Sequence, residues 1–411
     1  MSDNPMIRRF FRREADELTV HAREFVPHLH LLAYHIVGRI IEDPNVEVQQ
    51  ITNFAESFHD LEQVAVCWQT VEVGHEQRRQ YITAGYVFGV HRTLGNTKFV
   101  AILVREEPNV TLRLLIRSDD RQTMPALLDW LDLLENTDHP LKGCLFSLSQ
   151  TGMRFLPSQG VTRDDLVLPQ HVIDTVERNF AFLDQPEEFP PPLRHRALLL
   201  CGPPGVGKTM LAKWLSDRFR CTGLWTTPGA VWELGAATVF SLARKLRPAL
   251  LILEDLDVAA GDRRGNQPLG ELLGQLDGFY DLEDVAVLAT TNHPEVLDHA
   301  LDPSKRPGRF DRLLAIGPPD ADARARMLRR LVLRSGVLGD LRPSLFAALV
   351  DLSDGDTGAQ LAELVHDLES RIVWHRRRNE EVAVETLLQA VRNDRVRFRQ
   401  TSLGFAAQES A

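Results

Sequence analysis

The sequence predicts an α/β fold in which a parallel sheet is preceded by a smaller α+β domain and followed by a helical domain. Three observations support this prediction. Apolar runs of strand length alternate with helix-like segments in the middle of the chain, strand-like runs dominate its first third, and its last part has helical periodicity alone. The expected domains are residues 1–160, 161–319 and 320–411, in agreement with about 150 residues per domain.

The first domain is predicted from its apolar patterning. Apolar residues recur at helical spacing over residues 1–45, so a helix is expected there. The segments that follow are rich in β-branched residues and are separated by turn formers. Strands are expected at 64–73, 81–90, 99–104, 110–116 and 143–148, and a helix at 124–134. No catalytic pattern is recognisable in this domain, which we interpret as a substrate or adaptor domain.

The second and third domains follow a polar segment. Residues 153–165 are rich in turn formers, which predicts a linker, and a helix is expected at 170–183. Short apolar runs then predict strands buried on both faces of a parallel sheet, at 197–200, 250–253 and 285–289. From residue 321 onward apolar residues recur at helical spacing, so the chain is expected to end in helices.

Composition and charge exclude several classes of protein. Hydrophobic residues at 44% and charged residues at 25% are typical of globular proteins and exclude a disordered chain. The net charge of -10 argues against non-specific nucleic-acid binding. The four cysteines form no CxxC pair, so free thiols in a reducing compartment are expected. No segment approaches the about 20 uncharged residues of a membrane-spanning helix, so we expect a cytoplasmic protein.

A glycine-rich segment, GPPGVGKT, stands between a predicted strand and a predicted helix, and it fits the phosphate-loop pattern GxxxxGK[ST]. Backbone N–H groups and the helix N-terminus of such a loop cradle phosphates, while its lysine and its hydroxyl meet the terminal phosphates and Mg²⁺. Only six residues of the chain are lysines, so Lys208 in this position is a specific signal. The expected nucleotide-binding residues are Gly202, Pro203, Pro204, Gly205, Val206, Gly207, Lys208, Thr209 and Met210.

A group of carboxylates follows the apolar run at 250–253. Glu254, Asp255 and Asp257 stand at the carboxyl end of that predicted strand, which is the edge where open α/β sheets bind ligands. Nucleotide hydrolysis requires a carboxylate near Mg²⁺ and a group that orients the attacking water. A solvated acidic turn is the alternative interpretation, and the phosphate loop upstream favours the functional one.

Together these motifs resemble those of AAA+ ATPases of the AAA clade. GPPGVGKT resembles the Walker A motif and LLILEDLD resembles Walker B. Further resemblance lies in ELLGQLDGF, ATTNHPEVLDHALDPSKRPGRFDR and TGAQL, at residues 271–279, 289–312 and 357–361. The resemblance implies a P-loop NTPase fold with a C-terminal helical lid. It also implies Mg²⁺-dependent ATP hydrolysis by a ring, usually a hexamer, with protein-remodelling or chaperone-like activity.

The resemblance implies roles for individual residues as well. Asn292 corresponds to the first sensor, a polar group that orients the attacking water against the γ-phosphate. Arg306 and Arg309 correspond to paired arginine fingers, which reach the nucleotide of the neighbouring subunit. Gly358 lies in the segment that resembles the clade's small-residue turn near the adenine.

The order Glu254-Asp255 departs from the Asp-Glu order of most of the clade. It resembles the mitochondrial translocase of the Rieske iron-sulfur protein and related bacterial ATPases, although the membrane role of that translocase does not transfer to this chain. By this alignment Thr209 and Glu254 support Mg²⁺, the latter through water, and Asp255 is the base or the water-orienting group. An aspartate is one carbon shorter than a glutamate, about 1.5 Å of reach, so the rate of hydrolysis stays open.

The loop before Walker B offers two aromatic residues. Trp225 and Trp232 could serve in a central pore, but neither begins the aromatic-hydrophobic-glycine pattern of protein-threading members, and packing against the sheet is the alternative. The zinc-protease motif HExxH does not occur, since His75-Glu76 is followed by Gln-Arg-Arg. A fused zinc protease is therefore not expected.

Two other functions compete with protein remodelling. A scaffold that exchanges ATP slowly is favoured by the Glu254-Asp255 order. A nucleic-acid motor is supported by the arginine-rich tract at 371–399, which the solvated face of lid helices explains equally well.

Overall fold

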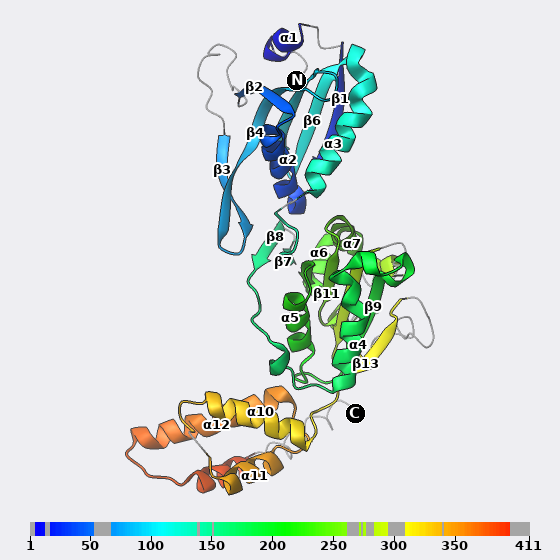
Figure 1. The fold of residues 1–411 in the computed structure, drawn as a ribbon. Coiled ribbons are helices and arrows are strands. Elements are labelled where there is room, and N and C mark those ends of the chain that lie inside the picture. The colour runs from blue at the N-terminus through cyan, green and yellow to red at the C-terminus, as the bar shows by residue number, and fades with distance from the viewer. Residues whose placement is uncertain are drawn as a thin grey trace, which may run out of the picture. The chain divides into compact units, whose positions relative to one another are not determined.

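The computed structural model describes residues 5–12, 17–52, 67–137, 140–149, 152–260, 271–272, 274–276, 283–294, 309–338 and 341–394 (Figure 1). The chain divides into two compact units. The first comprises Met1–Ser158, Cys221–Thr226 and Ser241–Ala249, and the second comprises Gln159–Arg220, Thr227–Phe240 and Leu250–Ala411.

An antiparallel sheet forms the body of the first unit. Its strand order is β1-β6-β5-β4-β2, and β3 pairs with the long strand β4. The strands are β1 (Leu18–Phe25), β2 (Val46–Thr52), β3 (Cys67–Gly74), β4 (Gln77–His91), β5 (Thr97–Glu106) and β6 (Asn109–Arg117). Helices α2 (His30–Glu42) and α3 (Met124–Asn136) pack together beside this sheet, and the short α1 (Pro5–Phe11) buries Ile7 and Phe11 against Tyr86 and Phe88 (Figure 1).

The strands expected at 81–90, 99–104 and 110–116 and the helix expected at 124–134 are confirmed. The strand expected at 64–73 is confirmed from residue 67, and residues 64–66 lie outside the described chain. The prediction of a helix over residues 1–45 is correct at α1 and α2 and wrong at residues 18–25, which form β1. In β1 the partly buried Thr19, His21 and Arg23 alternate with exposed neighbours, which is the period of a strand. Leu18 and Phe25 are seven residues apart, a spacing that fits a helical face also, so apolar spacing alone misassigned the segment.

The second sheet has the strand order β13-β9-β12-β11-β10-β7-β8. Its strands are β7 (Leu145–Ser149), β8 (Gly152–Leu156), β9 (His195–Cys201), β10 (Thr222–Thr226), β11 (Ala249–Leu253), β12 (Val285–Thr291) and β13 (Arg312–Ala315). The pair β9–β12 is parallel, as predicted, and the pairs β9–β13 and β7–β10 are parallel as well. β7, which was expected as a strand of the first domain, pairs instead within this second sheet. Every residue of β11 and β12 is buried, as expected for strands that helices cover on both faces.

The predicted linker at 153–165 is wrong at its start, because residues 152–156 form β8, which pairs antiparallel with β7. Phe155 is buried and its ring lies 4.6 Å from that of Phe146, measured between centroids. This aromatic contact offsets the polar composition of the segment.

Helices accompany the second sheet and complete the chain. They are α4 (Gln170–Phe180), α5 (Lys208–Arg218), α6 (Pro228–Leu234), α7 (Ala236–Lys245) and α8 (Leu256–Ala260), followed by α10 (Ala321–Arg334), α11 (Pro343–Leu352), α12 (Gly358–Arg377) and a helical segment at 384–394. Short 3₁₀ helices lie at Pro27–Leu29, Ser118–Thr123, Arg163–Asp165, Ala181–Leu183, Pro186–Glu188 and Pro191–Leu193. The helices after residue 320 share a leucine-rich core that includes Leu328, Leu349, Leu361 and Leu368, as the helical periodicity predicts. Among the described helices, none is both long and apolar enough to cross a bilayer.

Candidate nucleotide-binding site

The glycine-rich segment connects the buried strand β9 to the first turn of α5, which is the strand-loop-helix context that its motif requires. Gly202 and Gly205 have φ angles of +153° and +81°, which side chains rarely adopt. A Cβ atom at Gly202 would overlap the carbonyl oxygen of Ile316, and one at Gly205 would lie 2.6 Å from the Cβ of Ala359. Glycine is therefore required at both positions by backbone conformation and by space.

Lys208 is the first residue of α5 and is buried, with 6% of its side chain exposed. Its Nζ donates hydrogen bonds to the carbonyl oxygens of Gly202 at 2.6 Å and Pro203 at 3.0 Å. A further bond goes to Oδ1 of Asn292 at 2.8 Å. The lysine thus joins its own loop to the residue that follows β12.

The electrostatic environment of Lys208 combines burial with negative charge. Burial lowers the pKa of Lys208, while the carboxylates of Asp255 and Asp257 oppose this shift. Burial also raises the pKa of Cys201, the last residue of β9, to about 11, so this thiol is protonated at neutral pH.

The two carboxylates after β11 have different partners. Thr209 Oγ1 donates a hydrogen bond to Glu254 Oε1 at 2.8 Å, whereas Asp255 Oδ1 accepts one from Asn292 Nδ2 at 3.0 Å. Asp255 has a φ angle of +48°, in the left-handed region, and this turn of the backbone separates the two carboxylates. Glu254 is consequently directed to the loop threonine and Asp255 to the residue expected to be a sensor.

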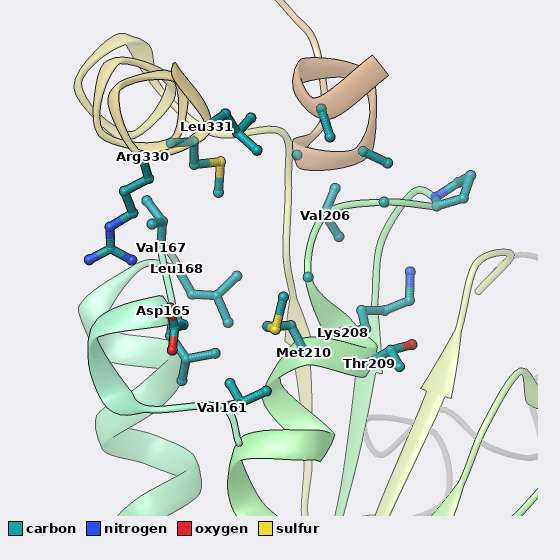
Figure 2. Close-up of a pocket in the computed structure, with 18 of the residues that line it drawn as sticks. Val161, Asp165, Val167, Leu168, Val206, Lys208, Thr209, Met210, Arg330 and Leu331 are labelled. Atoms are coloured by element: carbon teal, nitrogen blue, oxygen red, sulfur yellow. The ribbon is translucent and has the colours of Figure 1, made fainter. Parts of the chain in front are cut away.

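A cavity of about 710 Å³ lies beside the loop (Figure 2), within the usual size range of small-molecule sites. Figure 2 shows Lys208 and Thr209 at one end and Arg330 and Leu331 of α10 at the other. The lining residues come from the segment 160–168, the phosphate loop, the strand ends, α10 and α12. They include Val161, Asp165, Val167, Leu168, Pro204, Gly205, Val206, Gly207, Lys208, Thr209, Met210, Asp255, Asn292, Met327, Arg330, Arg334 and Gly358. The end at Lys208 is therefore charged, and the rest of the lining combines apolar side chains with Asp165, Arg330 and Arg334.

The beginning of α12 contacts the phosphate loop directly. The backbone N–H of Ala359 donates to the carbonyl oxygen of Gly205 at 3.2 Å. A Cβ atom at Gly358 would lie 3.2 Å from the same oxygen. Thr357 caps the helix with Gln360, whose Oε1 accepts from the Thr357 N–H at 2.8 Å. The small residues of this turn allow it to approach the loop closely.

The remaining predicted residues lie apart from this cavity or outside the described chain. Arg309 is 6% exposed and does not line the cavity. Arg306 lies outside the described residues. Trp225 is partly buried in β10, and Trp232 is 51% exposed on α6.

Sequence reasoning missed several residues that the structure brings to the site. Thr290 Oγ1 accepts a hydrogen bond from the backbone N–H of Asp255 at 3.0 Å, and Arg330 and Arg334 of α10 line the cavity. Residues 160–165 belong to the predicted linker and residues 166–168 to no predicted element, although the segment 160–168 supplies one wall of the cavity.

The fold and the loop define a P-loop nucleoside-triphosphate-binding domain. More narrowly, residues 198–318 match the family model for the ATPase family associated with various cellular activities (AAA), so this part of the chain is an AAA domain. The resemblance to the AAA clade is thereby confirmed.

Three relatives illustrate the match. The chain is 38% identical over 220 residues to ATP-dependent zinc metalloprotease FtsH 2 of Symbiobacterium thermophilum, covering 49% of this chain and 35% of that protein. It is 28% identical over 269 residues to the proteasome-activating nucleotidase of Methanocella arvoryzae, covering 56% of this chain and 62% of the relative. It is 36% identical over 192 residues to the mitochondrial inner membrane m-AAA protease component AFG3L2 of Mus musculus, covering 42% and 23%. The chain thus spans less than two thirds of the length of each of these relatives.

Proposed function

We propose that this chain binds ATP with Mg²⁺ and hydrolyses it. The observation that carries the proposal is the set of bonds at the charged end of the cavity, where Lys208 and Asp255 both contact Asn292, and Thr209 contacts Glu254. These groups come from the phosphate loop and from two adjacent strand ends, so they surround the place where a terminal phosphate would lie.

Each group has a role that its geometry supports. Lys208 neutralises charge on the β- and γ-phosphates, and the hydroxyl of Thr209 with the carboxylate of Glu254 forms a hard oxygen donor set that suits Mg²⁺. The bound ion would neutralise phosphate charge. Asp255 accepts a proton from the attacking water or orients it, and Asn292 holds Asp255 and Lys208 in a fixed relation. The apolar side chains of Val161, Val167 and Leu168 in the cavity wall would contact the base.

The test of ATP binding uses two lysines on the same helix. Lys208→Ala should abolish nucleotide binding or turnover, because it removes the buried charge at the phosphate end. Lys213→Ala is the matched control, since Lys213 lies on α5 but does not line the cavity. Unchanged ATP affinity and phosphate release in Lys208→Ala would refute the proposed function.

We further propose that the active form is a ring, and the two arginines between β12 and β13 in the sequence test it. Arg306 and Arg309 are proposed to act on the nucleotide of the neighbouring subunit. The test mixes Lys208→Ala subunits, which keep the arginines, with Arg306→Ala or Arg309→Ala subunits, which keep the phosphate loop. Recovery of activity in mixed assemblies supports action between subunits, and no recovery despite co-assembly contradicts it. Arg309 is buried, so its variant also requires a thermal unfolding control.

The proposed biological activity is remodelling of protein substrates in the cytoplasm, with residues 1–160 as substrate or adaptor domain. Two of the relatives are named as ATP-dependent zinc metalloproteases or protease components, and another as a proteasome-activating nucleotidase, which associates this type of domain with protein handling. The half-exposed Trp232 is the better candidate for contacting a polypeptide than the partly buried Trp225. Capture of bound proteins by Asp255→Asn and stimulation of ATP turnover by an unfolded protein test this proposal. Failure of both would favour the scaffold below.

A slow nucleotide-gated scaffold is the second candidate. Asp255 favours the scaffold, because its side chain is short and is held by Asn292 and by a left-handed backbone. A catalytic group displaced in this way can lower the rate by about 10²-fold. Steady-state phosphate release distinguishes a slow switch from a motor. Nucleic-acid binding is not favoured, since Arg371 pairs with Asp367 and Asp394, and Arg378 pairs with Glu380.

A further inference from the structure

The third carboxylate after β11 has a position unlike the other two. Asp257 lies in α8, is 8% exposed, and does not line the cavity. Its Oδ1 accepts a hydrogen bond from Thr291 Oγ1 at 2.8 Å and another from the backbone N–H of Asn292 at 3.0 Å. Thr291 Oγ1 in turn accepts from the backbone N–H of His293 at 3.1 Å. A buried carboxylate thus holds the chain where it leaves β12.

The same turn carries the side chain that joins the reactive groups. Asn292 accepts a hydrogen bond from Lys208 and donates one to Asp255. Because Asp257 bonds to the backbone of Asn292, it fixes the point from which this side chain extends. A second link, from the N–H of Asp255 to Thr290 Oγ1 at 3.0 Å, holds the neighbouring strand end. The two strand ends are therefore joined through both backbone and side chains.

We infer that Asp257 is a positioning residue, which acts on hydrolysis by holding the backbone of Asn292 in place. This inference rests on the proposed function, since it assigns Asp257 to the same reaction. These bonds matter more in the interior than on the surface, because a buried N–H or hydroxyl without an acceptor loses its hydrogen bonds to water and gains none. The chain would relieve that cost by shifting the turn, which moves Asn292 away from Lys208 and Asp255.

A second mechanism is separable from positioning. The negative charge of Asp257 also favours the charged form of Lys208 and opposes the effect of burial on the lysine's pKa. Both hydrogen bonds end on Oδ1, so an asparagine at this position can present its carbonyl oxygen to the same two donors without the charge. The pair Asp257→Asn and Asp257→Leu therefore separates hydrogen bonding from charge.

The experiment measures ATP turnover, ATP affinity and hydrogen exchange in full-length protein. Asp257→Asn should keep kcat within about threefold, whereas Asp257→Leu should lower kcat by about 10²-fold with little change in ATP affinity. Exchange of peptides covering residues 290–294 should accelerate only in Asp257→Leu. Glu135→Gln serves as the control for loss of a buried carboxylate, because Glu135 is 2% exposed and pairs with Arg23 in the first unit.

Three results would overturn the inference. They are an equal loss of kcat in Asp257→Asn and Asp257→Leu, which assigns the effect to charge; unchanged kcat in Asp257→Leu; and an unchanged exchange rate in Asp257→Leu. If the unaltered protein hydrolyses no ATP, the proposed function fails, and exchange at residues 290–294 still decides whether Asp257 holds the turn. If Asp257→Leu does not fold, which the loss of its thermal transition would show, Asp257→Ser replaces it in the exchange experiment. Hydrogen exchange at residues 290–294 should then be faster in Asp257→Ser than in the unaltered protein.

Discussion

The side-chain amide of Asn292 lies between two groups of opposite charge, accepting from Lys208 Nζ at 2.8 Å and donating to Asp255 Oδ1 at 3.0 Å. An amide is suited to this place because it offers an acceptor and a donor at once. A carboxylate would repel Asp255, and an apolar side chain would leave both charges without this partner. The spacing of lysine and aspartate is thus set by one neutral side chain.

Substitution of that amide should separate turnover from binding. In Asn292→Ala, phosphate release should fall by about 10²-fold, since misplacement of reacting groups has costs of this order, while ATP affinity changes little. Asn292→Asp should be at least as slow, because it keeps the acceptor for Lys208 but sets a carboxylate against Asp255. Asn136→Ala, on the exposed end of α3, is the control. Wild-type turnover in both Asn292 variants would show that the amide is dispensable.

The two adjacent carboxylates should respond differently to amide substitution. Asp255→Asn should bind ATP normally and lose turnover by about 10²–10⁴-fold, the range for loss of a general base. Glu254→Gln should instead raise the Mg²⁺ concentration required for half-maximal turnover, because Glu254 contacts the loop threonine. Mg²⁺ titrations of phosphate release measure both effects. If Glu254→Gln loses turnover with a normal Mg²⁺ dependence and Asp255→Asn does not lose turnover, the roles of the two carboxylates are the reverse of those proposed.

Two glycines with similar backbone conformations allow a matched test of the contact between loop and lid. Gly205 and Gly355 have φ angles of +81° and +76°, so alanine costs each about 1–2 kcal/mol in backbone strain. Only at Gly205 would the new Cβ also meet another side chain, at 2.6 Å from Ala359. Gly205→Ala should therefore lower the unfolding temperature more than Gly355→Ala and weaken ATP binding at least tenfold. If Gly205→Ala and Gly355→Ala lower the unfolding temperature and the ATP affinity equally, the beginning of α12 moves away from the loop without a measurable loss of stability.

The first unit should lose stability in mild acid. Burial lowers the pKa of His91 below its ordinary 6.5, and Asp43 opposes the shift. Between the folded pKa and 6.5 the unfolded chain binds the extra proton, so the free energy of unfolding decreases as pH falls through 6.5. The slope is at most about 1.4 kcal/mol per pH unit for each such group.

Urea unfolding at pH 7.5 and 5.5, followed by tryptophan fluorescence, measures this decrease, since the His91 ring packs 4.7 Å from that of Trp130. His91→Gln should reduce the difference between the two pH values, whereas the exposed His75→Gln should leave it unchanged. His35 has a pKa that burial lowers as well, so part of the difference should persist in His91→Gln. An identical difference in all three proteins would exclude His91 as a contributor.

The parts of the site that were predictable are those whose signals are local. GPPGVGKT between a strand and a helix, and carboxylates directly after an apolar run, can be recognised from neighbours in the chain. The cavity wall at 160–168 and Arg330 on α10 could not be found this way, because more than 150 residues separate them and only folding brings them to one cavity. The burial of Arg309 likewise depends on packing that its motif does not encode.

The same difference between local and long-range signals explains which elements of the fold were predicted. Strands that form a continuous apolar run, such as β11, were predicted. No strand was predicted at β2 (VEVQQIT) or β10 (TGLWT), where polar residues or glycine leave only one or two consecutive apolar residues, or at β13 (RLLA), which has only four residues. Residues 18–25 were misassigned because Leu18 and Phe25 fit a helical spacing, whereas the strand alternation is carried by the polar residues Thr19, His21 and Arg23. Pairing with β6, from Leu18 with Arg117 to Phe25 with Val110, decides between the two, and this partner lies about 90 residues away.

The hairpin of β7 and β8 affects how the protein can be divided. β10 pairs with β7 through Gly223, Leu224 and Trp225, and the N–H of Gly223 donates to the carbonyl oxygen of Cys144 at 2.9 Å. A recombinant fragment that begins at residue 161 would lack β7 and β8 and leave this side of β10 with unpaired amides and carbonyls. Such an edge recruits other strands and leads to aggregation. Insolubility of that fragment would therefore report a lost neighbouring strand, and a fragment that begins near residue 140 should remain in solution.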